Sequence, residues 1–105
     1  MLRRVRQRYL VLRIMSEETV NKEDLIKAVW NAVLQLYGEY GTSQVNLATI
    51  EVDPERNCAI LRCSHKALEM VRASLASITE INAKPVAIYV LGVSGTLKSL
   101  RKKFL

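Results

Sequence analysis

The sequence is poor in the residues on which metal sites and active sites depend. Its 105 residues contain one histidine and two cysteines, so the pattern offers no cysteine pairs or histidine cluster with metal-ligand spacing. The histidine, His65, falls where a helix is expected to begin. No serine or cysteine has an identifiable base, and the carboxylates show no paired spacing. We therefore expect no metal site and no catalytic residues in this chain.

Long hydrophobic runs are absent too. The longest apolar run, residues 86–91, is far shorter than the roughly 18 residues that a membrane-spanning helix needs. The arginine-rich start is followed by no small-residue cleavage pattern, so we expect a soluble, unprocessed chain. Cys58 and Cys63 lie an odd number of residues apart, which places them on opposite faces of one strand. We expect two free thiols in a reducing compartment, the cytoplasm.

Positive charge is plentiful and lies at the two ends. The sequence has 16 basic and 10 acidic residues, a net charge of +6. We expect a single domain over residues 1–105, with a basic N-terminal segment (1–8) and a basic C-terminal extension (96–105). Between the ends the chain is slightly acidic, so the pattern favours a polyanionic partner. The basic residues of the ends are Arg3, Arg4, Arg6, Arg8, Lys98, Arg101, Lys102 and Lys103.

Hydrophobic periodicity predicts an α+β fold. Apolar residues alternate in four segments, which predicts strands at 9–15, 45–52, 58–63 and 86–93. Helical spacing is found from residue 22 to about 40, stopping near Gly41, and again after Ser64, a candidate N-cap. The order βαββαβ is typical of a ferredoxin-like sandwich. We expect a four-stranded antiparallel sheet of order 4-1-3-2, two helices on one face, an open second face and a short basic C-terminal helix.

This topology brings the two basic ends together. The first and fourth strands are antiparallel neighbours in it, so the residues near Arg8 lie beside those near Gly92. Eight cations would form one phosphate-binding rim. The segment Gly92-Val93-Ser94-Gly95-Thr96 joins the last strand to the basic helix. Its backbone N–H groups suit an anion such as an RNA phosphate, or Ser94 or Thr96 simply caps the helix. The predicted RNA-binding residues are the eight cations with Gly92, Ser94, Gly95 and Thr96.

The sequence contains more apolar residues than the packing of two helices on one sheet face requires. The first helix has a second apolar stripe beside its core-facing one, and the open sheet face is largely apolar. Either this surface wraps the sheet edge or it binds a protein partner. The candidate protein-binding residues are Trp30, Leu34 and Tyr37 on the helix and Val11, Ile60 and Tyr89 on the sheet. The central strands lack the aromatic pair on which RNA-recognition domains stack bases, so sequence-specific single-strand readout is not expected.

Three short segments carry a family resemblance. They are Arg8-Tyr9-Leu10-Val11, Arg62-Cys63-Ser64-His65 and, most specifically, Gly92-Val93-Ser94-Gly95-Thr96 before a basic end. These segments resemble the protein component 2 family of ribonuclease P, the small ferredoxin-like subunit of the archaeal enzyme, which has a eukaryotic counterpart. The order of elements is similar over nearly the whole chain.

The resemblance implies a non-catalytic, RNA-binding subunit of a ribonucleoprotein that removes the 5′ leader from precursor tRNA. The RNA and its Mg²⁺ ions would supply the chemistry, and this chain would bind no cofactor. The implied partners are ribonuclease P RNA and a larger TIM-barrel protein subunit, with two such pairs associating into a heterotetramer that meets precursor tRNA indirectly. In a eukaryote the implied location is nuclear or nucleolar. The alternative from another class is a small-ligand-binding regulatory module on a ferredoxin-like fold.

Overall fold

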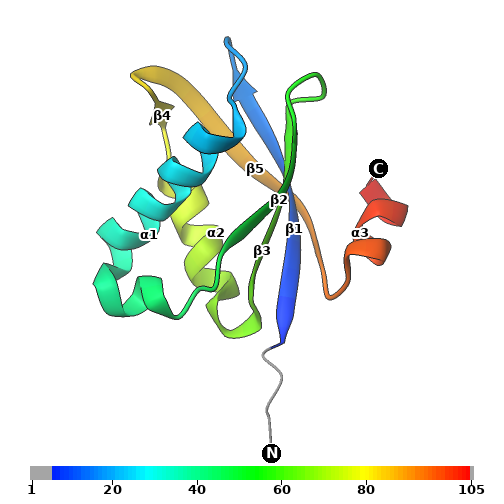
Figure 1. Cartoon of the computed structure of the whole chain (residues 1–105). Coiled ribbons are helices and arrows are strands. Elements are labelled where there is room, and N and C mark those ends of the chain that lie inside the picture. The colour runs from blue at the N-terminus through cyan, green and yellow to red at the C-terminus, as the bar shows by residue number, and fades with distance from the viewer. Residues whose placement is uncertain (1–5, 105) are drawn as a thin grey trace, which may run out of the picture.

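The structure, a computed structural model, describes residues 6–104 apart from the side chain of Phe104 (Figure 1). Arg3 and Arg4 lie outside the described residues. Five strands, three α-helices and one 3-10 turn follow one another along the chain. They are β1 (Gln7–Ser16), α1 (Lys22–Ser43), β2 (Ala48–Asp53), β3 (Cys58–Ser64), η1 (His65–Ala67), α2 (Leu68–Ser77), β4 (Glu80–Ile81), β5 (Lys84–Ser94) and α3 (Leu97–Phe104).

The strands form one antiparallel sheet in the order β2-β3-β1-β5-β4. The predicted α+β class is confirmed, but the predicted number of four strands is wrong. The fifth strand, β4, is a two-residue edge strand that forms a hairpin with β5. Asn82 and Ala83 connect them with φ angles of 55° and 63°, the left-handed backbone typical of tight hairpin turns. Two residues carry no measurable alternation, so the pattern indicated only a helix break here.

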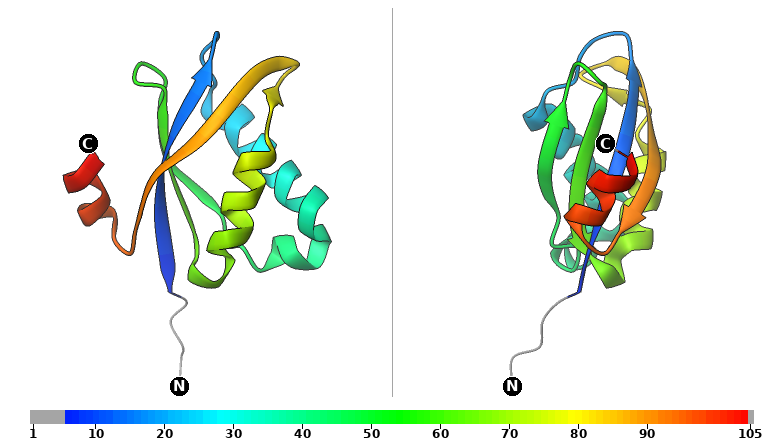
Figure 2. Two further views of the ribbon diagram at one scale, coloured as in Figure 1. Left: turned by 180° about the vertical axis from the view of Figure 1, so that it is seen from behind. Right: turned by 90° about the vertical axis from the view of Figure 1, so that its right-hand side faces the viewer.

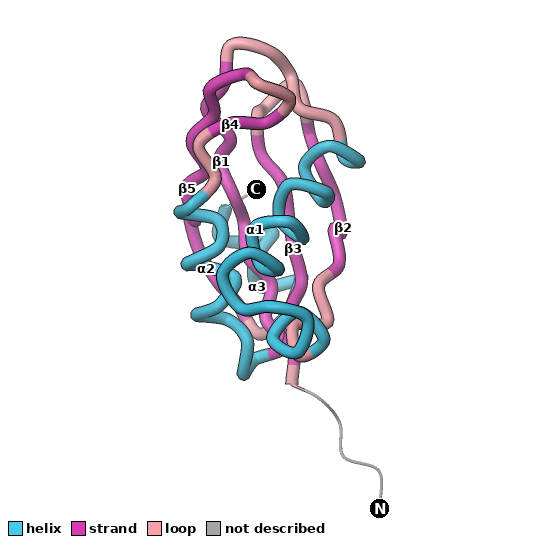
Figure 3. The backbone as a smooth tube through the Cα atoms, turned by 90° about the vertical axis from the view of Figure 1, so that its left-hand side faces the viewer, coloured by secondary structure: helices cyan, strands magenta, loops and turns pink. Residues whose placement is uncertain are grey.

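Helices α1 and α2 cover one face of the sheet (Figure 3). Alternate residues of β1, among them Leu10 and Leu12, point into the core between the helices and the sheet. The predicted α1 stripe is buried from Leu25 to Val33. The prediction that this stripe continues through Leu36 to Tyr40 is wrong, because both of these side chains are exposed.

The end of α1 is redirected by a kink. Gly38 has a φ of 72° and a ψ of −176°, a backbone that a side chain at this position would strain. The helical course then resumes, so Gly41 is not the stop that the pattern predicted, and α1 continues to Ser43. Gly41 is buried instead, and a Cβ there would lie 3.1 Å from the Met70 methyl group. After the kink, Tyr40 is exposed while Gly41 is buried.

Helix α3 packs against the opposite face of the sheet (Figure 2). Leu100 is fully buried and forms a small second core with Val11 and Ile60. Leu97 lies three residues earlier, on the same side of the helix, and packs against this cluster. The prediction that this face of the sheet is open is therefore wrong for the part that α3 covers, because two leucines in the basic segment give the helix an apolar side.

The segment between β3 and α2 differs in detail from the prediction. Ser64 makes no side-chain capping bond to the helical residues that follow it. Its hydroxyl donates instead to the Gln44 carbonyl, 2.9 Å away, and so ties the end of β3 to the end of α1. His65 begins η1, as expected of a helix-start residue, and its backbone N–H donates to the Arg6 carbonyl. None of the described helices has the length and hydrophobicity of a membrane span.

Candidate nucleic-acid interface

The start of β1 and the end of β5 meet at one corner of the molecule. Tyr9 is the register partner of Ser94, and a guanidinium nitrogen of Arg8 lies 3.4 Å from the position that a Cβ on Gly95 would occupy. This antiparallel pairing places Arg8 next to the turn that leads into α3, whereas Arg6 lies beside His65 at the start of η1. The predicted meeting of these two segments is present.

The turn before α3 is organised by hydroxyl groups. The Thr96 side chain accepts a hydrogen bond from the Ser99 backbone N–H at 3.2 Å, and the Ser94 hydroxyl accepts one from the Thr96 N–H at 3.3 Å. Thr96 therefore caps α3, one of the two outcomes that the sequence left open. Binding of a phosphate by Gly92, Ser94, Gly95 or Thr96 stays a prediction.

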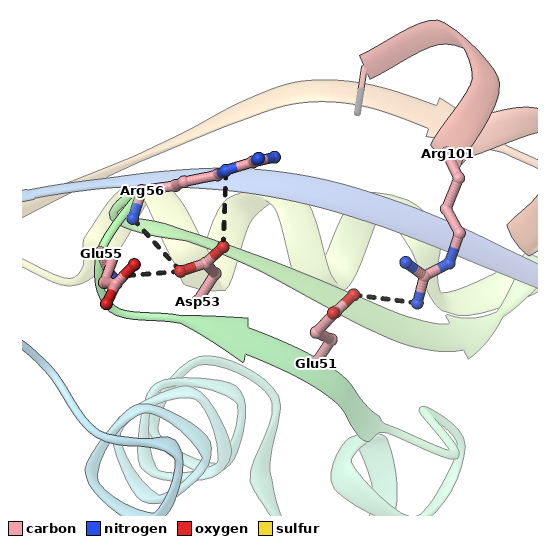
Figure 4. Close-up of polar contacts among 5 residues, drawn as sticks. All are labelled: Glu51, Asp53, Glu55, Arg56 and Arg101. Carbon is pink, nitrogen blue, oxygen red and sulfur yellow. Dashed lines mark hydrogen bonds and ion pairs between the residues drawn. The ribbon is translucent and has the colours of Figure 1, made fainter.

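From this turn, α3 runs back across the sheet rather than away from it (Figure 1). Arg101 reaches the outer strand β2, where its guanidinium lies 2.9 Å from the Glu51 carboxylate. Figure 4 shows this ion pair between the helix and the strand. The expectation of a single rim of eight cations stays a prediction, because Arg3 and Arg4 lie outside the described residues. Docking of the leucines places the cations of α3 over the sheet face rather than at its edge.

We call the α3 helix and the side of the sheet on which it lies the α3 face. Its acidic side chains on β2 are occupied by neighbouring arginines. Glu51 pairs with Arg101, and Asp53 lies 3.7 Å from the Arg56 guanidinium while accepting backbone N–H bonds from Glu55 and Arg56 (Figure 4).

Two further arginines on this face form no ion pair within residues 6–104: Arg13 and Arg62. The Nε of Arg62 is buried, with no hydrogen-bond partner among the described atoms. Helix α3 adds four basic residues and no acidic one. The α3 face therefore has an excess of positive charge, and Lys98, Lys102 and Lys103 project from it into solvent.

The candidate protein-binding residues fall into three groups. Val11 and Ile60 are covered by α3, so they are not available to a partner while that helix is docked. Trp30 is half-buried and packs against the main core. The other three, Leu34, Tyr37 and Tyr89, are exposed.

Four further exposed apolar side chains are not among the candidate protein-binding residues. They are Met15, Leu36, Tyr40 and Leu91. The glycine at position 38, inside an otherwise regular helical pattern, was the signal that could have placed Tyr40 outside the core.

The cysteines offer no reactive thiolate. Both are free. Burial raises the pKa of the Cys63 thiol to about 11, and burial, followed by the nearby Asp53 carboxylate, raises the pKa of Cys58. A thiol with a raised pKa is a poor nucleophile and a poor metal ligand at neutral pH. Across the part of the chain that the structure describes, no three His, Cys, Asp or Glu side chains gather as metal ligands would.

Known proteins resemble this chain over almost its whole length. Ribonuclease P protein component 2 of Pyrococcus furiosus is 38% identical over 102 residues, which cover 97% of this chain and 85% of that protein. The protein of the same name from Methanosarcina mazei is also 38% identical and covers 97% of this chain and 86% of its own length. A chain in the cryo-EM structure of yeast ribonuclease MRP shares the fold, with a TM-score of 0.73 at 17% identity, covering 98% of this chain and 94% of its own.

The match to a family is equally extensive. Residues 8–105 match the Rpp14/Pop5 family. The matched region includes every strand and helix of the structure except the first residue of β1. The chain belongs to the Rpp14/Pop5 family.

Proposed function

We propose that this chain is a non-catalytic protein subunit of ribonuclease P that binds the RNA of the ribonucleoprotein. In this role it supports RNA-catalysed removal of the 5′ leader from precursor tRNA. The observation that carries the RNA-binding part is the charge of the α3 face, where β2 carboxylates are paired and the α3 lysines are free to meet phosphates. The relatives of nearly equal length named as ribonuclease P components support the assembly.

The finer parts of the proposal concern partners and surroundings. The RNA partner is ribonuclease P RNA, with Mg²⁺ held by the RNA, and precursor tRNA is met only indirectly. The protein partner is a larger TIM-barrel subunit, and two such pairs associate into a heterotetramer. The exposed apolar residues on α1 support a protein partner on the side away from α3. The free thiols support a reducing compartment such as the cytoplasm, and a eukaryotic counterpart would act in the nucleus.

We further infer that the fold is a ferredoxin-like sandwich with an added hairpin strand. The four long strands lie in the order β2-β3-β1-β5, and α1 and α2 pack on one face, which supports this assignment. In such a sandwich α3 is an addition that converts the second face of the sheet into a basic one.

A small-ligand regulatory module is not favoured by the described surface. A groove of about 430 Å³ lies between α1 and the segment joining α2 to β4. It is open and lined largely by polar side chains such as Lys27, Asn31 and Gln35, whereas ligand sites are typically enclosed and mostly apolar.

The salt dependence of RNA binding tests the proposal. Changing Lys98, Lys102 and Lys103 together to Ala removes three exposed charges from α3. If each contacts a phosphate, the slope of log affinity against log salt should flatten by about 2 to 3. Affinity should fall for all RNA sequences alike, because phosphate contacts do not read bases. The measurement is a binding titration of the full chain with ribonuclease P RNA at several salt concentrations.

A matched control separates local contacts from net charge. Lys22, Lys27 and Lys66 are also exposed but lie on α1 and η1, away from α3. Their change to Ala removes the same charge and should leave the slope nearly unchanged. Equal flattening in both triple variants would show that only total charge matters, and no flattening in either would refute RNA binding by α3.

A further inference from the structure

Helix α3 covers only part of the sheet face on which it lies. Its buried Leu100 sits over Val11 and Ile60, near the middle of β1 and β3. The far halves of β1 and β5, toward the β2–β3 turn, have no helix in front of them on this side (Figure 2, right). Met15 and Tyr89, in those halves, are both more than half exposed.

The strand register makes neighbours of an arginine and a tyrosine in this uncovered area. Arg13 on β1 is the direct cross-strand partner of Tyr89 on β5. Residues 12 and 14 and residues 88 and 90 face the main core, so by alternation Arg13 and Tyr89 face the opposite side together. Directly opposed side chains in an antiparallel pair start about 5 Å apart, within contact range for long side chains.

Met15 extends the same surface along β1. It lies two residues beyond Arg13 on the same side of the strand, a step of about 7 Å. We call the patch formed by Arg13, Met15 and Tyr89 the Arg13–Tyr89 platform. Such a platform was not expected because sequence reasoning considered aromatics on the central strands alone. Here the aromatic residue, Tyr89, is on β5, and only its neighbour Arg13 is on the central strand β1.

Charge favours a nucleic acid over a protein as the occupant. Arg13 has no carboxylate within ion-pair distance among residues 6–104, while the acids of β2, which β3 separates from β1, are bound to Arg56 and Arg101. The platform also lies on the same side of the sheet as α3 and its free lysines. An RNA strand that follows these lysines would have its phosphates and bases near the platform.

We propose that the Arg13–Tyr89 platform stacks an unpaired base of RNA. This inference rests on the proposed function and adds to it a contact with single-stranded RNA. The tyrosine ring supplies a flat apolar surface for any base, and the arginine supplies a guanidinium that stacks or pairs with the adjoining phosphate. The platform offers no array of hydrogen-bonding groups for a base edge, so it selects unpaired nucleotides rather than a sequence.

Binding of two simple RNA probes by the full chain tests this. One probe is a single-stranded oligonucleotide of mixed sequence, about ten nucleotides long, and the other is a fully paired hairpin. Tyr89→Leu should weaken binding of the single strand about tenfold, since loss of one stacked base has this order of effect. Tyr89→Phe should retain affinity because it keeps the ring. The hairpin should bind both variants equally, and the salt slope should not change because no charge is lost.

Tyr40 provides the matched control. It is 81% exposed on α1, on the other side of the sheet, so Tyr40→Leu should not alter binding of either probe. Circular dichroism melts would establish that all variants fold.

Three results would overturn the inference. The first is that Tyr89→Leu binds the single strand with the affinity of the wild type. The second is that Tyr89→Leu loses as much affinity for the hairpin as for the single strand. The third is unchanged RNA binding with lost association of the larger protein subunit, which would make the platform a protein contact. In each case a flattened slope in the α3 lysine variant would leave the proposed function standing.

Discussion

Cys63 places a weakly acidic thiol in the middle of the main core. Its side chain is fully buried, and burial raises its pKa from 9.0 to about 11. An unfolded chain therefore ionises this thiol near pH 9, whereas the folded chain keeps the proton until about pH 11. Because unfolding releases a proton in this window, the free energy of unfolding must fall as the pH rises through it.

Replacement of Cys63 by Ala should remove this part of the pH dependence. Between about pH 8 and pH 10, the variant should lose about 1 kcal/mol less stability than the wild type, as one pKa unit corresponds to about 1.4 kcal/mol. Urea titrations at both pH values measure the difference. Cys58→Ala is the control, because Cys58 is only partly buried and should show a smaller effect. An identical loss of stability in wild type and Cys63→Ala would contradict the assignment.

Helix α3 depends on very few contacts for its position. Leu100 is its one fully buried residue among those whose side chains are described, and Leu97 supports it at the edge of the small second core. The ion pair between Arg101 and Glu51 joins side chains that are 46% and 44% exposed. Exposed pairs of this kind contribute at most about 1 kcal/mol, so the leucines and not the ion pair hold the helix.

Leu100→Ala should therefore release α3 without unfolding the sheet. A fully buried Leu→Ala change in a main core costs about 2 to 5 kcal/mol, and Leu61→Ala, equally buried beneath α1 and α2, should show such a loss. Leu100→Ala should cost less globally, because α3 can detach alone. Hydrogen exchange of the α3 amides should accelerate to near the rate of an unstructured chain. An equal fall in global stability for both variants would show instead that α3 and the sheet unfold as one unit.

What the sequence could predict at this scale was limited to elements with local periodicity. The long strands and the start of α1 show such periodicity clearly. The expected topology then placed the residues near Arg8 beside those near Gly92, and the β1–β5 pairing agrees with this. Strand β4 is too short to carry a pattern, and the kink at Gly38 depends on one backbone conformation. The docking of α3 depends on contacts between Leu100 and residues some forty and ninety positions earlier in the chain, which no local window contains.

The sequence predicts which charged residues belong to the candidate site, but it does not predict how they are arranged in space. Lys98, Lys102 and Lys103 follow from composition alone. The Arg13–Tyr89 pair depends on the register between β1 and β5, which contains a bulge between Val11 and Leu12. A bulge shifts every later pairing by one residue, so a regular register counted from Tyr9 would not have placed these two side chains together.

The whole molecule has two sides of different chemistry. The α3 helix has four basic residues and no acidic one, whereas α1 has three acidic and two basic residues. The C-terminal half of α1 exposes a group of large apolar side chains. These are Leu34, Leu36, Tyr37 and Tyr40. Exposed apolar groups of this kind typically mark protein interfaces. Under the proposed function, we therefore expect RNA to bind on the α3 side of the sheet and a protein partner to bind on the α1 side.

Changes on one side should therefore leave binding on the other side intact. Replacing Leu34 and Tyr40 together by Ser removes two exposed apolar side chains and should weaken association with the larger protein subunit at least about tenfold, as expected for central interface residues. Calorimetric titration with that purified subunit measures the loss. The same variant should bind RNA with an unchanged salt slope, while the Lys98, Lys102 and Lys103 variant should do the reverse. If either variant weakened both partners equally, the two surfaces would be coupled and the separation by the sheet would be wrong.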